Sequence, residues 1–202
     1  MNKLPVLLIT TIFLILTGSL FAQKTLSLGP RLGVNFSSLV GDDANTDTQT
    51  GLVLGLTSTY SINEKTGLGV DLLYSREGAE SKIGEINTHL DYIRIPVTFQ
   101  YFFRGWEDDF RPKIYAGIVP GILVGAEVGG EDAKDQTNGF DLAGTLGLGF
   151  NYRLSEGARG VWLNTDLRYQ RGFTSVPEAD DFEIFNQTLQ FSVGVAFGLD
   201  SQ

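Results

Sequence analysis

Apolar and polar residues alternate with a period of two along most of the chain. Eight such stretches follow one another, separated by turn-rich or acidic segments, and no sustained helical period occurs after residue 22. The alternation predicts eight β-strands, at approximately 26–38, 50–60, 67–77, 89–103, 112–125, 139–153, 160–172 and 187–198. Most of these are about as long as a tilted strand that crosses a bilayer.

The two alternating sets of residues differ in kind. One set is large and aliphatic or aromatic in every stretch, as in Leu52, Leu54 and Leu56. The other set is small or polar, and it carries six charges near the middle of the stretches: Arg31, Asp71, Arg94, Asp141, Asp166 and Arg168. Three of these charges are positive and three are negative, so their signs balance.

The size of an eight-stranded barrel decides which set faces inward. Its interior is just wide enough for side chains, so the large apolar set would overfill it. Glycines and matched charges fit, because a buried charge is tolerated when it is paired and hydrogen-bonded. A soluble lipocalin-type barrel needs the reverse arrangement, and here it would expose a broad apolar band to water. We therefore predict that the apolar set faces lipid and that the six charged residues form one connected network in the lumen.

The connections between the stretches alternate in length. Shorter ones lie near 61–66, 104–110 and 154–159, and longer, mostly acidic or polar ones lie near 40–49, 78–87, 126–138 and 174–186. Short turns at one end and longer loops at the other are typical of outer-membrane barrels. The sequence thus predicts an all-β fold: a monomeric, eight-stranded, antiparallel up-and-down transmembrane β-barrel in the cell outer membrane, with both termini in the periplasm.

The first 22 residues have a different composition. Lys3 is followed by a mostly apolar run and then by a small-residue exit near Ala22, which is the order of a secretory signal peptide. A retained membrane anchor is the alternative, but the apolar run is short for a spanning helix. We expect cleavage just after Ala22, which leaves one barrel domain over 23–202.

Charge and cysteine content restrict the partners. The formal net charge is -9, and an acidic chain is a poor nucleic-acid binder because phosphate contacts need clustered Lys and Arg. The chain has no Cys, so disulfides and thiolate metal sites are excluded. Outer-membrane lipid is the expected surrounding of the barrel. The acidic loops at 40–49, 126–138 and 174–186 are the surface that we predict for other envelope or secretion proteins.

Catalytic and metal-binding patterns are weak. His89 is the only histidine, and a hydrolase would need a Ser beside it, for which Ser81 is the neighbouring candidate. The run 43–47 imitates the start of a calcium loop, but its sixth position is Thr48 and its twelfth is Leu54, where Gly and Glu are required. The sequence therefore predicts no catalytic, cofactor or metal site, with a lipid-modifying enzyme based on His89 as the least favoured alternative.

Four segments resemble one family of outer-membrane barrels. They are GPRLGVNFSSL (29–39), LLYSREGAE (72–80), LDYIRIPVTFQYFF (90–103) and LRYQRGFTSV (167–176), and together they look like the PorT-like outer-membrane β-barrel domain over residues 23–199. This resemblance implies an accessory role in protein secretion across the outer membrane. A small-solute channel lined by the six charges is the alternative, although only much wider barrels hold an aqueous channel.

Overall fold

The computed structural model describes residues 26–41, 46–81, 87–155, 160–177 and 183–199. The predicted signal peptide, 1–22, lies outside these ranges. The elements are β1 (Leu26–Gly41), β2 (Thr46–Ser61), β3 (Thr66–Ser81), β4 (Asn87–Arg94), β5 (Val97–Phe102), β6 (Phe110–Val128), β7 (Glu131–Asp132), η1 (Lys134–Gln136), β8 (Phe140–Ser155), β9 (Val161–Gly172) and β10 (Ile184–Gly198). Among the described residues, no helix has the length and apolarity to cross a membrane.

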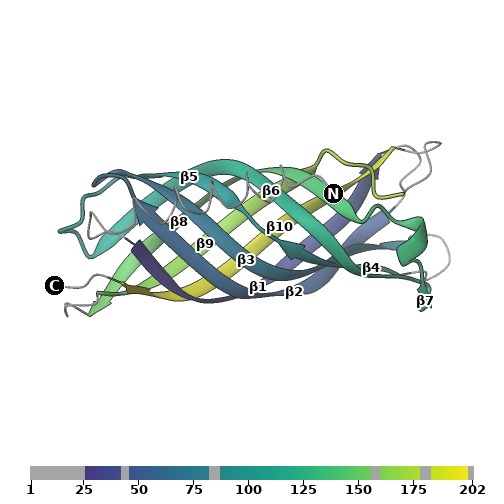
Figure 1. Ribbon diagram of the computed structural model, residues 1–202, viewed down its shortest axis with the longest axis horizontal. Helices are drawn as coiled ribbons and strands as arrows, with labels where there is room; N and C mark the ends of the chain where they lie inside the picture. The colour runs from purple at the N-terminus through teal and green to yellow at the C-terminus, as the bar shows by residue number, and fades with distance from the viewer. Residues whose placement is uncertain (1–25, 42–45, 82–86, 156–159, 178–182, 200–202) are drawn as a thin grey trace, which may run out of the picture.

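The strands form one antiparallel sheet that closes on itself. β1 pairs with β2 on one side and with β10 on the other, and the ring continues through β9, β8, β6, the β4–β5 pair and β3 back to β2. β4 and β5 are two pieces of one wall strand, because both pair with β3 and with β6. The wall therefore has the eight strands that the sequence predicts, and Figure 1 shows them wrapping obliquely around the barrel axis.

One predicted strand is interrupted. The stretch 89–103 was expected to be continuous, but β4 ends at Arg94 and β5 begins at Val97. Pro96 lies in the gap, and a proline has no backbone N–H for the ladder. Hydrogen bonds still join this segment to both neighbouring strands. Ile95 N donates to Pro120 O of β6 at 2.9 Å, and Pro96 O accepts from Asp71 N of β3 at 3.0 Å. The break therefore leaves the barrel closed.

The strands extend further than predicted at one end of the barrel. We call this the long-loop end, where β1, β3, β6 and β9 finish, and the opposite one the short-turn end. β2 begins at Thr46 and β3 runs to Ser81, and these two residues pair with each other. The expected loops at 40–49 and 78–87 are correspondingly shorter. Backbone pairing continues where apolar and polar residues no longer alternate. The alternation marks only the part of a strand that faces an apolar surrounding.

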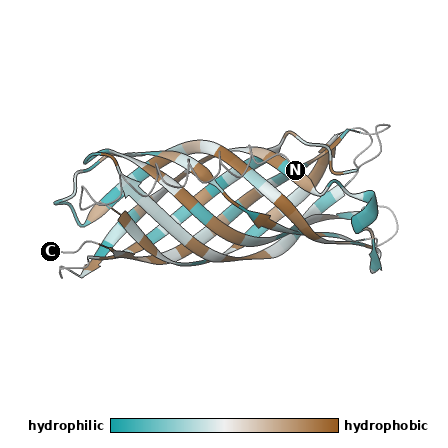
Figure 2. Cartoon of the chain, in the orientation of Figure 1, coloured by the Kyte–Doolittle hydropathy of each residue, from teal (hydrophilic) through white to brown (hydrophobic). Residues whose placement is uncertain are grey.

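The predicted outer face is the exposed face. Leu32 is 66% exposed and Leu146 is 60% exposed, whereas Asn35 and Ser192 on the opposite face are 0% exposed. In Figure 2 brown hydrophobic segments alternate with white and teal ones along the wall strands, and the hydrophilic colour of β7 and η1 lies at the long-loop end. An apolar outside and a polar inside is the reverse of a soluble ligand-binding barrel, and it is the arrangement of a transmembrane one.

Candidate functional site in the barrel lumen

All six charged residues of the sequence prediction are buried inside the barrel, each at most 5% exposed: Arg31, Asp71, Arg94, Asp141, Asp166 and Arg168. They come from five wall strands, and the period of two turns each of them away from lipid. Their contacts fall into two groups at different heights in the lumen. The single network that we expected is therefore corrected to two groups.

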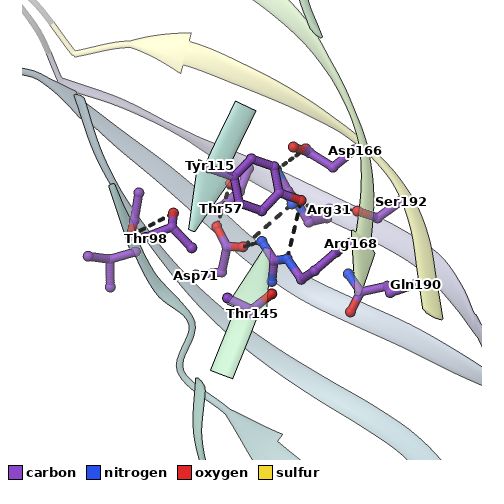
Figure 3. Close-up of polar contacts among 12 residues, drawn as sticks. Arg31, Thr57, Asp71, Thr98, Tyr115, Thr145, Asp166, Arg168, Gln190 and Ser192 are labelled. Atoms are coloured by element: carbon purple, nitrogen blue, oxygen red, sulfur yellow. Dashed lines mark hydrogen bonds and ion pairs between the residues drawn. The ribbon is translucent and has the colours of Figure 1, made fainter. Parts of the chain in front are cut away.

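The first group, which we call the central group, lies near mid-height and is drawn in part in Figure 3: Arg31, Asp71, Lys113, Asp166 and Arg168. Asp166 forms ion pairs with Arg31 Nη2 at 2.8 Å and with Lys113 Nζ at 3.0 Å. Asp71 forms ion pairs with Arg168 Nη2 at 2.8 Å and with Arg31 Nη1 at 3.5 Å. Each carboxylate therefore has two cationic partners, and Arg31 joins the two carboxylates.

Neutral side chains complete the central group. Thr57 Oγ1 donates to Asp71 Oδ1 at 2.7 Å, and the Tyr115 hydroxyl accepts from Arg168 Nε at 3.4 Å. The Arg168 guanidinium also lies 5.4 Å from the centre of the Tyr115 ring, within the range of a cation–π contact. Gly147 makes room for this ring, because a Cβ at that position would lie 2.4 Å from Tyr115 Cζ.

The second group, which we call the outer group, lies nearer the long-loop end and consists of Glu77, Arg94 and Asp141. Arg94 Nε and Nη2 bind the two Glu77 oxygens at 3.0 and 2.6 Å, and Nη1 binds Asp141 Oδ2 at 2.5 Å. Glu77 also accepts from Ser75 Oγ at 2.8 Å and from Asn186 Nδ2 at 2.9 Å. A single guanidinium thus holds two carboxylates, and one of them is bound by the two-pronged geometry that suits arginine.

The two groups carry opposite net charge. The central group has three cations and two carboxylates, and the outer group has one cation and two carboxylates. Their formal charges are therefore +1 and -1, which cancel only when both groups are counted together. The two groups together contain four cations and four carboxylates, and Arg111 is a ninth buried charge that belongs to neither group.

Two members of these groups were missed at the level of sequence. Glu77 and Lys113 both lie inside predicted strands and on the inward set, since Glu77 is six residues from Asp71 and Lys113 is two residues from inward-facing Tyr115. The period of two was therefore a sufficient signal for them. Both lie near the end of a predicted stretch, Glu77 in 67–77 and Lys113 in 112–125, whereas the predicted network was built from mid-strand charges.

The weaker candidates for chemistry have ordinary surroundings. The side-chain amide nitrogen of Gln49 in β2 lies 2.6 Å from Nδ1 of half-buried His89 in β4, a polar contact that passes over β3. Thr48 and Leu54 belong to β2, so this part of the calcium-like run is extended strand. Asp43 and Asn45 of that run lie outside the described residues. Within the ranges that the structure describes, no group of three or more His, Asp or Glu side chains is placed to hold a metal ion.

A closed antiparallel barrel with an apolar outside and an ion-paired lumen defines an integral outer-membrane β-barrel protein. Comparison with protein families agrees, because residues 21–178 match the model described as outer membrane protein beta-barrel domain. The chain belongs to that family, and its location is the outer membrane. A comparison with curated proteins gave no match.

Solved structures with a similar fold are outer-membrane barrels. Neisserial surface protein A, NspA, has a TM-score of 0.52 and 16% sequence identity, and the match covers 83% of this chain and 96% of that one. The outer membrane protein OprG from Pseudomonas aeruginosa also has a TM-score of 0.52 and 16% identity, over 86% of this chain and 95% of that one. At this identity the likeness concerns the fold alone.

Proposed function

We propose that the protein is an outer-membrane anchor whose long-loop end is a binding platform for other envelope proteins. The observation that carries this proposal is the filling of the lumen by two ion-paired groups, each residue of which is at most 5% exposed. A lumen of this kind supports a role in fixing strand register and barrel shape rather than in conduction. The remaining surface for a specific function is then formed by the connections.

The long-loop end has the chemistry of a platform for basic partners. The connection between β6 and β8 carries the exposed acidic residues Glu131, Asp132 and Asp135, and exposed Glu127 lies at the end of β6. Exposed charges of one sign steer partners of the opposite sign and set the rate of association. The resemblance of four segments to the PorT-like domain supports, as the finer proposal, an accessory role in protein secretion. The barrel acts as a monomer in this proposal and carries out no catalysis.

A small-solute channel is the second candidate. It is favoured by the polar lining, which continues beyond the two charged groups through the buried residues Asn151, Asn164, Gln170 and Gln190. Single-channel recording in planar bilayers separates the two candidates. Steady, ion-selective conductance of the unmodified protein would favour the channel over the anchor.

The platform is tested by capture of partners from gently solubilised outer membranes. In one variant Glu131→Gln, Asp132→Asn and Asp135→Asn remove three charges at the long-loop end. The matched control, Glu107→Gln, Asp108→Asn and Asp109→Asn, removes three exposed acidic charges at the short-turn end. We expect the first variant to lose partners that the intact protein and the control retain. Equal capture by all three forms would contradict the proposed platform.

A further inference from the structure

An apolar cluster fills the lumen at the long-loop end, where the sequence predicts only small or polar residues. We call it the mouth cluster, and its members are Leu90, Tyr92, Leu123, Ala126 and Val176, with half-buried Leu39 packed against them. Tyr92 connects this cluster to the outer group, because the Arg94 guanidinium lies 4.1 Å from the centre of its ring. The mouth cluster therefore lies directly beside the ion pairs of Arg94.

Val176 reaches the mouth cluster in a different way from the other members. The others belong to the wall strands β1, β4 and β6, whereas Val176 lies in the connection that follows β9. Its own backbone N–H donates to Ile184 O at 2.7 Å. It is 9% exposed, so a residue from a predicted loop is packed into the lumen.

One side chain from another connection holds this segment in place. Asn138 precedes β8, and its Nδ2 donates to Ser175 O at 2.7 Å and to Pro177 O at 3.0 Å. Its backbone N–H donates to Val176 O at 2.9 Å. Asn138 thus binds three consecutive carbonyl groups, and Thr137 pairs with Pro177 in an antiparallel bridge.

We propose that residues 175–177 are a latched stopper of the barrel, with Val176 as the stopper and Asn138 as the latch. In the latched state Val176 closes the mouth cluster and keeps water away from the outer group. Release of the latch withdraws one side chain from the cluster while the wall strands keep their hydrogen bonds. Local openings of this kind need far less free energy than global unfolding, because few contacts are broken.

The proposal does not depend on partner binding. A stopper can close an anchor or a channel, so failure of the platform experiment leaves it unaffected. It predicts a specific pattern of water access, which can be measured because the chain has no Cys of its own. A single cysteine introduced into the mouth cluster then reports on the stopper alone.

The test uses Leu123→Cys and a water-soluble maleimide on the purified, folded barrel in detergent. With Asn138 present we expect slow labelling, since Leu123 is 3% exposed. Asn138→Ala in the same background should raise the labelling rate about tenfold or more, because two side-chain hydrogen bonds of ordinary strength are lost. Val176→Gly should raise it as well without changing the latch, and heat-modifiable gel mobility confirms that each variant is folded.

Two controls make the outcome decisive. Glu131→Cys, on the exposed β7, gives the rate of an unprotected cysteine. Asn63→Ala is the matched control for Asn138→Ala, because Asn63 Oδ1 accepts from Lys65 N and Thr66 N, both at 2.9 Å, at the short-turn end. We expect Asn63→Ala to leave the labelling of Leu123→Cys unchanged. Fast labelling with Asn138 and Val176 intact, or no acceleration in either Asn138→Ala or Val176→Gly, would overturn the proposal.

Discussion

The two charged groups of the lumen bind their buried carboxylates in different ways. In the central group each carboxylate is bound by two cations, so the loss of one cation leaves a partner behind. In the outer group both carboxylates depend on Arg94, and the other contacts of Glu77 come from the neutral donors Ser75 and Asn186. Each carboxylate of the central group therefore keeps one cation when the other is lost, whereas both carboxylates of the outer group depend on Arg94.

The largest expected effect follows from this difference. Among the residues that the structure describes, Arg94 carries the only guanidinium that binds Glu77 and Asp141. Arg94→Gln removes it, and breaking a buried pair by removing one partner costs about 3–5 kcal/mol. Arg168→Gln should cost less, because Asp71 keeps Arg31 at 3.5 Å and Thr57 at 2.7 Å. Urea unfolding of the barrel in detergent measures both changes. Equal losses of unfolding free energy would show that the outer group is not the more dependent one.

Coupling between residues tests the division into two groups. Asp166 and Lys113 share an ion pair at 3.0 Å, so Asp166→Asn and Lys113→Met should be non-additive by about 0.5–3 kcal/mol. Asp166→Asn and Arg94→Gln belong to different groups and should add to within about 0.5 kcal/mol. Double-mutant cycles on the free energy of unfolding give both values. Strong coupling between Asp166 and Arg94 would restore the single network that the sequence suggested.

The period of two predicted the inward face correctly, but it could not predict which charged side chains pair with one another. Side-chain direction is fixed locally by the pleat of each strand, so Arg31, Asp71 and Asp166 could be assigned from sequence alone. Which of them meet depends on the stagger of strands around the ring, and this quantity has no local signal. For that reason the pairing of Arg94 with Glu77 was not foreseen.

The mouth cluster was unpredictable for a different reason. Leu90, Tyr92 and Leu123 lie on the inward set of their strands, yet Val176 lies in a segment that the sequence assigns to a loop. The carbonyl groups on either side of it accept hydrogen bonds from Asn138 in another connection, far away along the chain. Loop conformations of this kind follow from tertiary contacts and not from hydrophobic periodicity.

Packing around the two groups gives a smaller effect. A Cβ at Gly147 would lie 2.4 Å from the Tyr115 ring and 2.7 Å from Leu167 O, whereas a Cβ at Gly121 would lie 2.6 Å from Arg94 Nη1. Gly147→Ala meets a ring and backbone, so we expect a loss of about 1–3 kcal/mol of unfolding free energy from overpacking. Gly121→Ala meets the Arg94 guanidinium, which three hydrogen bonds to carboxylates hold in place, so we expect a loss in the same range. Urea unfolding of the two variants measures both losses, and an unchanged unfolding free energy in either variant would contradict the expected overpacking.

The smallest expected effect concerns the tyrosines beside the two arginines. Tyr115→Phe removes the hydroxyl that accepts from Arg168 Nε at 3.4 Å but keeps the ring. The ordinary net value of a hydrogen bond is about 0.5–1.5 kcal/mol, and a contact this long belongs at the lower end of that range. Tyr92→Phe is the matched variant beside the outer group, where the Tyr92 ring centre lies 4.1 Å from the Arg94 guanidinium. Because Arg94 is held by three hydrogen bonds to carboxylates, we expect Tyr92→Phe to change the unfolding midpoint less than Tyr115→Phe. A larger shift for Tyr92→Phe would mean that the outer group relies on the Tyr92 hydroxyl as well as on its ion pairs.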